Sequence, residues 1–169
     1  LKLSQEDPTP HGPLWVAGRP RPFDNEPIVS GRSDVAIAQT EPASEPWTLL
    51  GEITAEVTTS SAQPSHDVCV RVFDVYPDGR AIFLTEGVRR VTTEVTEPSP
   101  ATVDLWQVAH TVRAGHRLRV EIAPAAKLRW DVNPGHDQTA DSPAQAQDVE
   151  VTIHSAHLSF FSPDSPIEE

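Results

Sequence analysis

Two runs decide the fold: Phe73-Asp74-Val75-Tyr76-Pro77-Asp78-Gly79-Arg80 and Ala114-Gly115-His116-Arg117-Leu118-Arg119-Val120. The first begins with strand-forming residues and ends in a turn. Proline has the fixed φ that suits the second position of a turn, and the Asp-Gly pair after it tolerates the left-handed backbone that reverses the chain. The first run therefore predicts a strand that stops at a tight turn.

The second run predicts a strand that begins after Gly115. Along it, Leu118, Val120 and Ile122 alternate with Arg117, Arg119 and Glu121. Side chains of a strand point alternately to its two faces, so one face is apolar and the other is charged. Neither run contains a nucleophile, a phosphate-binding loop or a metal-binding cluster, so both indicate architecture rather than chemistry.

Composition limits the kind of protein this is. The 169 residues are enough for one domain, and 37% hydrophobic with 22% charged residues is typical of a soluble globular chain. The 25 acidic and 13 basic residues give a net charge of −12, which argues against nucleic acid or an anionic membrane as a partner. No apolar run approaches the ~18–20 residues of a membrane span, and no signal peptide is apparent.

The single cysteine, Cys69, lies among Val68, Val70 and Val72. This setting predicts a small buried hydrophobe rather than a reactive thiol, and one cysteine cannot form an internal disulfide. We therefore favour a cytoplasmic location. The chain has no methionine and starts at Leu1, from which we expect it to be a piece of a longer protein.

The chain divides into a lead-in and a domain. Residues 1–34 are rich in proline and glycine, which predicts an extended arm that lies on a surface or leads in from a preceding domain. Residues 35–169 contain short strand-like runs separated by turn residues, and no helix of ten or more residues is expected. The runs are Val35–Thr40, Leu49–Thr59, Val68–Tyr76, Ala81–Thr85, Val88–Val95, Val103–His110, Leu118–Ala123, Val149–His154 and Leu158–Phe161.

Loops are expected at Ser61–Asp67, Thr96–Thr102 and Pro124–Asp148. The number and spacing of the strands predict an all-β fold, a two-sheet antiparallel sandwich.

Several short motifs occur in a fixed order along this chain. Asp74-Val75-x-Pro77-Asp78-Gly79-Arg80 and Glu86-Gly87-x-x-Arg90 precede Leu105-Trp106-x-x-Ala109-His110. Then come Ala114-Gly115-His116-Arg117-Leu118-Arg119-Val120 and Arg129-Trp130-Asp131-x-Asn133-Pro134-Gly135. With Asp7-Pro8-Thr9-Pro10 upstream, this order resembles the C-terminal domain of the X-Pro dipeptidyl-peptidase and cocaine-esterase-like serine hydrolases, from about Asp7 to Phe161.

The resemblance implies a jelly-roll sandwich, similar to galactose-binding domains, that packs on an N-terminal α/β-hydrolase domain of the same polypeptide. That domain carries the Ser-Asp-His triad in the family. The resemblance also implies a structural role for one set of residues here: Asp74, Pro77, Asp78, Gly79, Arg80, Gly87, Trp106, His110, Gly115, His116, Arg117, Asp131 and Asn133.

The chain itself offers little catalytic chemistry. A nucleophile elbow needs Gly-x-Ser-x-Gly, and the sequence has none, so we expect no catalytic residue here and no cofactor. His154 and His157 are three apart on a predicted strand and point to opposite faces, which disfavours a shared metal. Asp131 and Asn133 could supply oxygen ligands for calcium, but turn capping is the preferred interpretation, and no metal site is assigned.

Two histidines beside strands, His110 and His116, are interpreted as hydrogen-bonded structural groups rather than bases.

The arginines have two interpretations. Arg117 and Arg119 could pair across strands with Asp74, Glu86 or Glu121, with Arg89 and Arg90 on a neighbouring strand. Alternatively, Arg117 and Arg119 contact the hydrolase domain, where a guanidinium can make planar bidentate contacts.

Among the tryptophans, Trp106 is expected to face the core together with Val108. Trp15 and Trp47 lie in or beside proline-rich stretches and are open to exposure or to burial against a partner domain.

These observations favour a non-catalytic accessory domain that packs on a serine hydrolase domain and helps to shape its substrate pocket. The alternative is a stand-alone carbohydrate-binding sandwich, and an adhesion module without a ligand is a weaker third. Self-association into a homo-oligomer stays open as a further contact, because an accessory domain separated from its partner would expose an apolar patch.

Overall fold

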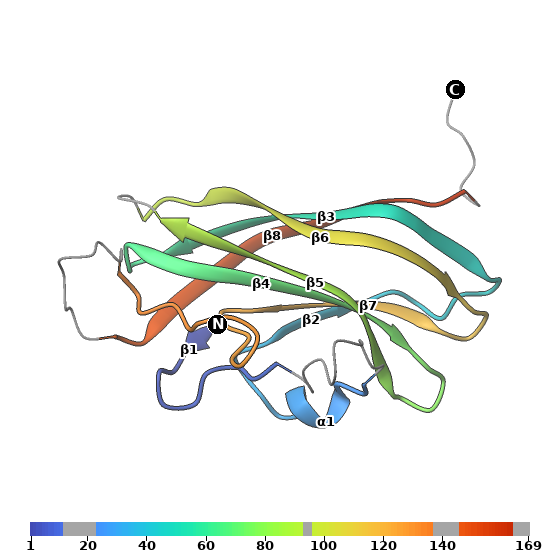
Figure 1. Cartoon of the computed structure of the whole chain (residues 1–169), viewed down its shortest axis with the longest axis horizontal. Coiled ribbons are helices and arrows are strands. Elements are labelled where there is room, and N and C mark those ends of the chain that lie inside the picture. Colours follow the sequence, from blue (N-terminus) through green and yellow to red (C-terminus); the bar gives the residue numbers. More distant parts are fainter. Residues whose placement is uncertain (12–22, 93–95, 137–145, 164–169) are drawn as a thin grey trace.

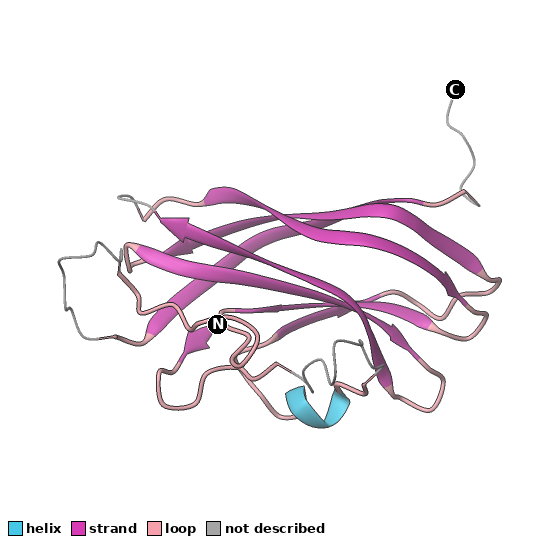
Figure 2. Cartoon of the chain, viewed as in Figure 1, coloured by secondary structure: helices cyan, strands magenta, loops and turns pink. Residues whose placement is uncertain are grey.

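The computed structural model describes residues 1–11, 23–92, 96–136 and 146–163. Within these residues the chain is built almost entirely of strands, with one short helix (Figure 2). The elements are β1 (Lys2–Leu3), α1 (Glu26–Val29), β2 (Ala36–Gln39), β3 (Trp47–Ser61), β4 (Ser65–Val75), β5 (Ala81–Thr92), β6 (Ser99–Val112), β7 (Arg117–Ala123) and β8 (Val149–Phe161). In this part of the chain no helix has the length and apolar content needed to cross a membrane.

The strands form two antiparallel sheets packed face to face (Figure 1). Sheet one has the order β1-β8-β3-β6, and sheet two has the order β2-β7-β4-β5. This interleaving of eight strands, in which each sheet alternates early and late strands, is the jelly-roll arrangement of two Greek keys. The predicted two-sheet antiparallel sandwich is confirmed.

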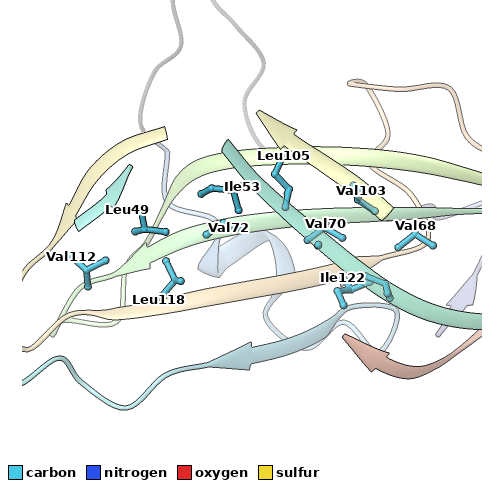
Figure 3. Close-up of a cluster of buried hydrophobic side chains, with 12 residues drawn as sticks. Leu49, Ile53, Val68, Val70, Val72, Val103, Leu105, Val112, Leu118 and Ile122 are labelled. Atoms are coloured by element: carbon cyan, nitrogen blue, oxygen red, sulfur yellow. The ribbon is translucent and has the colours of Figure 1, made fainter. Parts of the chain in front are cut away.

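The main core lies between the two sheets and follows from strand alternation. On β3, Ile53, Ala55 and Val57 are buried while the residues between them are at least partly exposed. Sheet two contributes Val68, Val70 and Val72 from β4 to the same cluster (Figure 3). The period of two read from Leu49–Thr59 therefore predicts the inward face correctly.

Strand β5 runs without a break through Gly87, so the expected separate strands Ala81–Thr85 and Val88–Val95 are one element. Gly87 lies where β5 approaches β6 of the other sheet. A Cβ atom there would collide with the carbonyl oxygen of Asp104 and lie 2.9 Å from Cγ1 of Val103. The glycine thus permits close contact between the sheet edges rather than a turn.

Strand β8 likewise joins two expected strands, Val149–His154 and Leu158–Phe161. Pairing with β3 continues from Val151 to Phe161, with a register shift near His154. The intervening polar residues are exposed, because they lie at the surface of a continuous strand. The expected loops are correspondingly shorter, since β3 extends to Ser61, β4 begins at Ser65 and β6 begins at Ser99.

The amino-terminal arm folds against the sandwich. Its first residues form β1, which pairs with β8, and α1 contributes Val29 to a small cluster with Val35 and Ala123. The described parts of the arm that follow β1, including α1, lie on the side of sheet two that faces away from the core (Figure 1). The division of the chain at residue 34 stays a prediction, and Trp15 lies outside the described residues.

Candidate interaction site

The turn expected at Pro77–Arg80 is present and joins β4 to β5. The Gly79 N–H donates to the carbonyl of Tyr76 (2.9 Å), and Gly79 has φ +92°, which favours glycine. Asp78 accepts hydrogen bonds from the backbone N–H of Arg80 and from its Nε (3.2 and 2.8 Å). These bonds, the backbone one first, lower the pKa of Asp78. The turn is therefore held by its own polar side chains.

Just before the turn, Asp74 joins two histidines from different strand ends. Its Oδ2 lies 3.0 Å from Nε2 of His110, and its Oδ1 lies 2.9 Å from Nδ1 of His116. The carboxylate is 3% exposed, and the ring of Tyr76 packs on His116 with centroids 4.4 Å apart. Both histidines are hydrogen-bonded, as predicted, and their structural role stays a prediction. Asp74, His110 and His116 come together although 42 residues separate the first from the last.

A groove of about 650 Å³ opens beside this turn. Asp24, Glu26, Pro27 and Pro42 contribute to its walls. The remaining wall carries motif residues, which the fold gathers at one end of the sandwich: Pro77, Asp78, Gly79, Arg80, Gly115 and Arg117. The groove is lined by polar and apolar groups in similar measure.

The two arginines proposed as an interface have different environments. The side chain of Arg117 is 32% exposed at the groove, donates to the Thr40 carbonyl (2.9 Å) and pairs with Glu41 (3.6 Å). Arg119 is 9% exposed and binds Glu26 at 2.6 Å. Arg117 is thus available to a partner, while Arg119 is already engaged inside the chain.

Two of the three charged side chains of β7, Arg119 and Glu121, are buried rather than exposed. Glu121 and Arg71 of the adjacent strand are both fully buried and lie 3.3 Å apart, and Asn25 of the arm donates to Glu121 (2.7 Å). Arg119 lies 3.6 Å from Glu121 on the same strand. Of the three acidic residues predicted as partners, Glu121 is the one that contacts Arg119 in the described part of the chain. Burial raises the pKa of Glu121, although Arg71 opposes this effect.

More charge contacts tie the arm and the 124–135 segment to sheet two. His11 Nε2 lies 2.6 Å from Glu86, which also accepts from Arg129 (3.0 Å). Arg32 holds Asp34 (2.7 Å), which also accepts from Thr9. Burial alone would raise the pKa of Asp34, but the hydrogen bonds from Arg32 and Thr9 lower it overall. We use the name polar layer for the buried charge contacts on this side of sheet two, which involve Arg71, Glu86, Arg119 and Glu121 and their partners in the arm and at Arg129.

The predicted neighbourhood of the strand arginines is wrong. Strand β4 separates β5 from β7, so Arg89 and Arg90 do not lie beside Arg117 and Arg119. Arg90 instead makes a bidentate contact with Asp67 (2.8 and 2.9 Å). The order of strands in a sheet depends on long-range connections that local alternation does not encode.

The Asp131–Gly135 segment is irregular, with a bend at Gly135, and Asn133 supplies the capping hydrogen bond that the turn interpretation predicts. Asn133 is fully buried, donates to Asp67 (2.8 Å) and Ser65 (3.0 Å), and accepts from the Gly135 N–H (2.8 Å). Asp131 is exposed. Among the described residues, no three His, Cys, Asp or Glu side chains are grouped so as to hold a metal ion.

Trp106 does not face the core, contrary to prediction. It is 69% exposed and has φ +70°, at a bulge where two residues of β6 oppose one of β3. The bulge changes the alternation, so Leu105 and Val108 both contact the core while Trp106 points outward. Trp47 is partly buried and stacks on Phe160, with ring centroids 5.6 Å apart.

Cys69 is 1% exposed, and burial raises the pKa of its thiol, so it is the predicted inert hydrophobe. Two residues of the polar layer, Arg71 and Asn25, were not predicted from the sequence. A charged residue inside the valine-rich run Val68–Tyr76 was the one signal for Arg71, while nothing local marked Asn25.

Residues 2–159 match a family model described as the X-Pro dipeptidyl-peptidase C-terminal non-catalytic domain. Cocaine esterase from Rhodococcus sp. (strain MB1 Bresler) is 30% identical over 130 residues, which is 71% of this chain and 22% of the esterase.

Solved structures show the same fold. An α-amino acid ester hydrolase superposes with a TM-score of 0.75 at 21% identity, over 82% of this chain and 27% of that one. An aminopeptidase from Thaumarchaeota archaeon gives 0.71 at 22% identity, with the same coverage. A CocE/NonD family hydrolase from Staphylococcus aureus gives 0.52 at 12% identity, over 76% of this chain and 33% of that one. The chain therefore spans about a quarter of the length of these relatives.

Proposed function

The chain belongs to the family of X-Pro dipeptidyl-peptidase C-terminal non-catalytic domains, and we propose that it serves as the accessory domain of a longer serine hydrolase. In this proposal the catalytic triad lies in an α/β-hydrolase domain of the same polypeptide, which cleaves an ester or an amide through an acyl-enzyme. The accessory domain packs on that domain and forms part of the wall of its substrate pocket.

One observation carries the proposal. A family model described as non-catalytic matches nearly the whole chain. The relatives of this chain are hydrolases, and the chain covers only 22% to 33% of their length. Their names describe an esterase, an ester hydrolase and an aminopeptidase, and acyl transfer is common to all three reactions. The substrate of the proposed parent enzyme is left open.

The groove beside the β4–β5 turn is the predicted contact with the substrate pocket. Arg117 is the side chain best placed to make it, because its guanidinium is partly exposed and its partner Glu41 is almost fully exposed. Exposed ion pairs contribute little to stability, so a partner domain could redirect Arg117 at small cost. Arg119 serves the groove indirectly, since its pairs with Glu26 and Glu121 hold the groove wall.

The test compares Arg117→Ala and Arg119→Ala in the full-length polypeptide and in the isolated 169-residue chain. Arg117→Ala should lower hydrolase activity or the Tm of the full-length protein and leave the Tm of the isolated chain nearly unchanged. Arg119→Ala should lower the Tm of both, because it breaks a buried network. An equal effect of Arg117→Ala in both contexts would contradict the proposed contact.

The alternative, a carbohydrate-binding sandwich, has one observation in its favour. The exposed indole of Trp106 lies beside Glu52, Asp104 and Gln107, and an aromatic face flanked by polar groups can stack and hydrogen-bond a sugar ring. Retention of the isolated chain on immobilised polysaccharide, lost in Trp106→Ala, would favour this alternative. Elution of the isolated chain without retardation would contradict the carbohydrate-binding alternative and favour the accessory role.

A further inference from the structure

The two sheets differ in what covers the face that points away from the core. On sheet two that face is covered by the arm and α1 through the polar layer (Figure 1). No described segment lies over the corresponding face of sheet one, formed by β8, β3 and β6. We call this second surface the outer face of sheet one.

A row of apolar side chains crosses this outer face. Leu50 of β3 pairs in register with Ala109 of β6 on one side and with Phe161 of β8 on the other. Directly opposed residues of antiparallel strands point to the same face, so the three lie side by side. Leu50 is 43% exposed, Phe161 is 60% exposed and Ala109 is also exposed. The outer face of a solvated sheet is normally polar, so this row indicates contact with another surface.

Trp106 adds a second feature at the side of the row. Its bulge presents the indole to solvent over a depression of about 360 Å³ that is lined by Trp106, Glu52, Asp104 and Gln107. Glu52 and Gln107 are paired in register, two residues along their strands from Leu50 and Ala109. Asp104 accepts the backbone N–H of Trp106 (2.9 Å), which holds the bulge.

The lining of the depression selects the charge of what would fill it. Glu52 and Asp104 make no ion pair within the described part of the chain, and no lysine or arginine lines the depression. An indole face together with two carboxylates attracts a guanidinium or ammonium group, by cation–π and ionic interaction. A partner that fits this face therefore combines an apolar surface with one basic side chain.

We propose that the outer face of sheet one, centred on Leu50, Phe161 and Trp106, is the docking surface for the hydrolase part of the same polypeptide. That part presents an apolar patch to the row and an arginine or lysine to Trp106. This chain covers 22% of the esterase and 27% of the ester hydrolase, so most of each relative lies outside the matched domain and a large partner is present in both. This inference rests on the proposed function and adds to it the surface and its chemistry.

Oxidative footprinting by mass spectrometry tests the proposal directly. Hydroxyl-radical labelling of Trp106, Phe161 and Tyr76 is compared between the full-length polypeptide and the isolated chain. Trp106 and Phe161 should react about fivefold more slowly in the full-length protein, in proportion to the accessible surface that docking removes. Tyr76, at the groove, reports separately on the contact placed there under the proposed function.

The outcomes separate the two proposals. Unchanged labelling of Trp106 and Phe161 with protection of Tyr76 would overturn the docking surface and leave the accessory role. No protection of any of the three would overturn both. Protection of Trp106 and Phe161 that depends on the concentration of the isolated chain would assign the face to a second copy and also overturn the proposal.

A pair of variants provides the matched control. Leu50→Ser removes the centre of the apolar row from an exposed position, while Thr54→Ser alters the same strand away from the row. Leu50→Ser should restore most of the labelling of Phe161 in the full-length protein and leave the Tm of the isolated chain within a few degrees. Thr54→Ser should change neither, and equal effects of the two variants would contradict the proposal.

Discussion

Val70 and Arg71 are neighbours on β4 and are both fully buried, yet they lie in two different interiors. Val70 points into the apolar core between the sheets, and Arg71 points into the polar layer beneath the arm. An apolar contact is non-directional, so Val70 needs only filled space around it. A buried charge needs a specific partner, so Arg71 depends on Glu121 and on the carbonyl of Pro10, which accepts from it at 3.2 Å.

The two interiors also differ in how completely their polar atoms are satisfied. The Nε atoms of Arg71 and Arg119 are buried and have no hydrogen-bond partner among the described residues. The apolar core places its polar groups at its two ends, with His66 bound to Thr59 at one (2.9 Å) and Asp74 at the other, and of these His66 alone has a buried atom, Nδ1, without a hydrogen-bond partner among the described residues. We therefore expect the polar layer to determine where the arm lies, and the burial of apolar surface to supply most of the stability.

The largest effect is expected when the polar layer loses one charge. Arg71→Met should lower the free energy of unfolding by about 3 kcal/mol, because it leaves the buried Glu121 without its nearest cation. The double variant Arg71→Met/Glu121→Leu should regain most of that loss. Urea denaturation of the wild type, the two single variants Arg71→Met and Glu121→Leu, and the double variant measures both effects.

A double variant that is less stable than either single variant would contradict the view that Arg71 and Glu121 depend on each other as a buried pair. Val70→Ala serves as the control from the apolar core, since Glu121→Leu should not compensate for it.

A smaller loss of stability is expected at the contact between the edge strands β5 and β6. Gly87→Ala should cost about 2 kcal/mol, because the added methyl group meets the backbone carbonyl of Asp104 rather than a side chain that can move. Gly79→Ala, at a turn with open space, should suffer only from its positive φ. Equal stability of Gly87→Ala and wild type in thermal denaturation would show that the sheet edges are not in close contact.

A pH-dependent effect, smaller again, is expected at the polar end of the apolar core. Burial lowers the pKa of His66 below 6.5, so the unfolded chain binds a proton that the folded chain excludes. The stabilisation is complete above pH 6.5 and is lost as the pH falls below it. His66→Gln should flatten the change of Tm between pH 7.5 and 5.5. An unchanged slope in that variant would assign the dependence to other groups.

The smallest effect concerns a residue that belongs to neither interior. Trp106→Gly should raise the free energy of unfolding of the isolated chain by about 0.5 kcal/mol, because glycine adopts the positive φ without strain and the indole is exposed. A clear loss in chemical denaturation would show that the indole packs on the sheet. Trp130→Gly, at a position without a positive φ, is the matched comparison.

Much of the fold follows from local pattern. The alternation of Leu49–Thr59 and Leu118–Ala123 marks the inward faces, and the Asp-Gly turn ends β4 as expected. The division of β5 at Gly87 was wrong because a glycine that permits close approach looks the same in sequence as one that makes a turn. The prediction for Trp106 was wrong because a bulge adds one residue and reverses the alternation beyond it.

The sequence alone predicts an all-β sandwich and the place of most strands, because period-two alternation and turn chemistry act over a few residues. The order of the short motifs along the chain carries the family resemblance. That Arg119 and Glu121 of β7 are buried depends on the tertiary structure. Arg71, Glu121 and Asn25 are distant in the chain, and each could equally have faced water. Whether a charge is solvated or paired depends on which segment covers it, and only the folded chain contains that information.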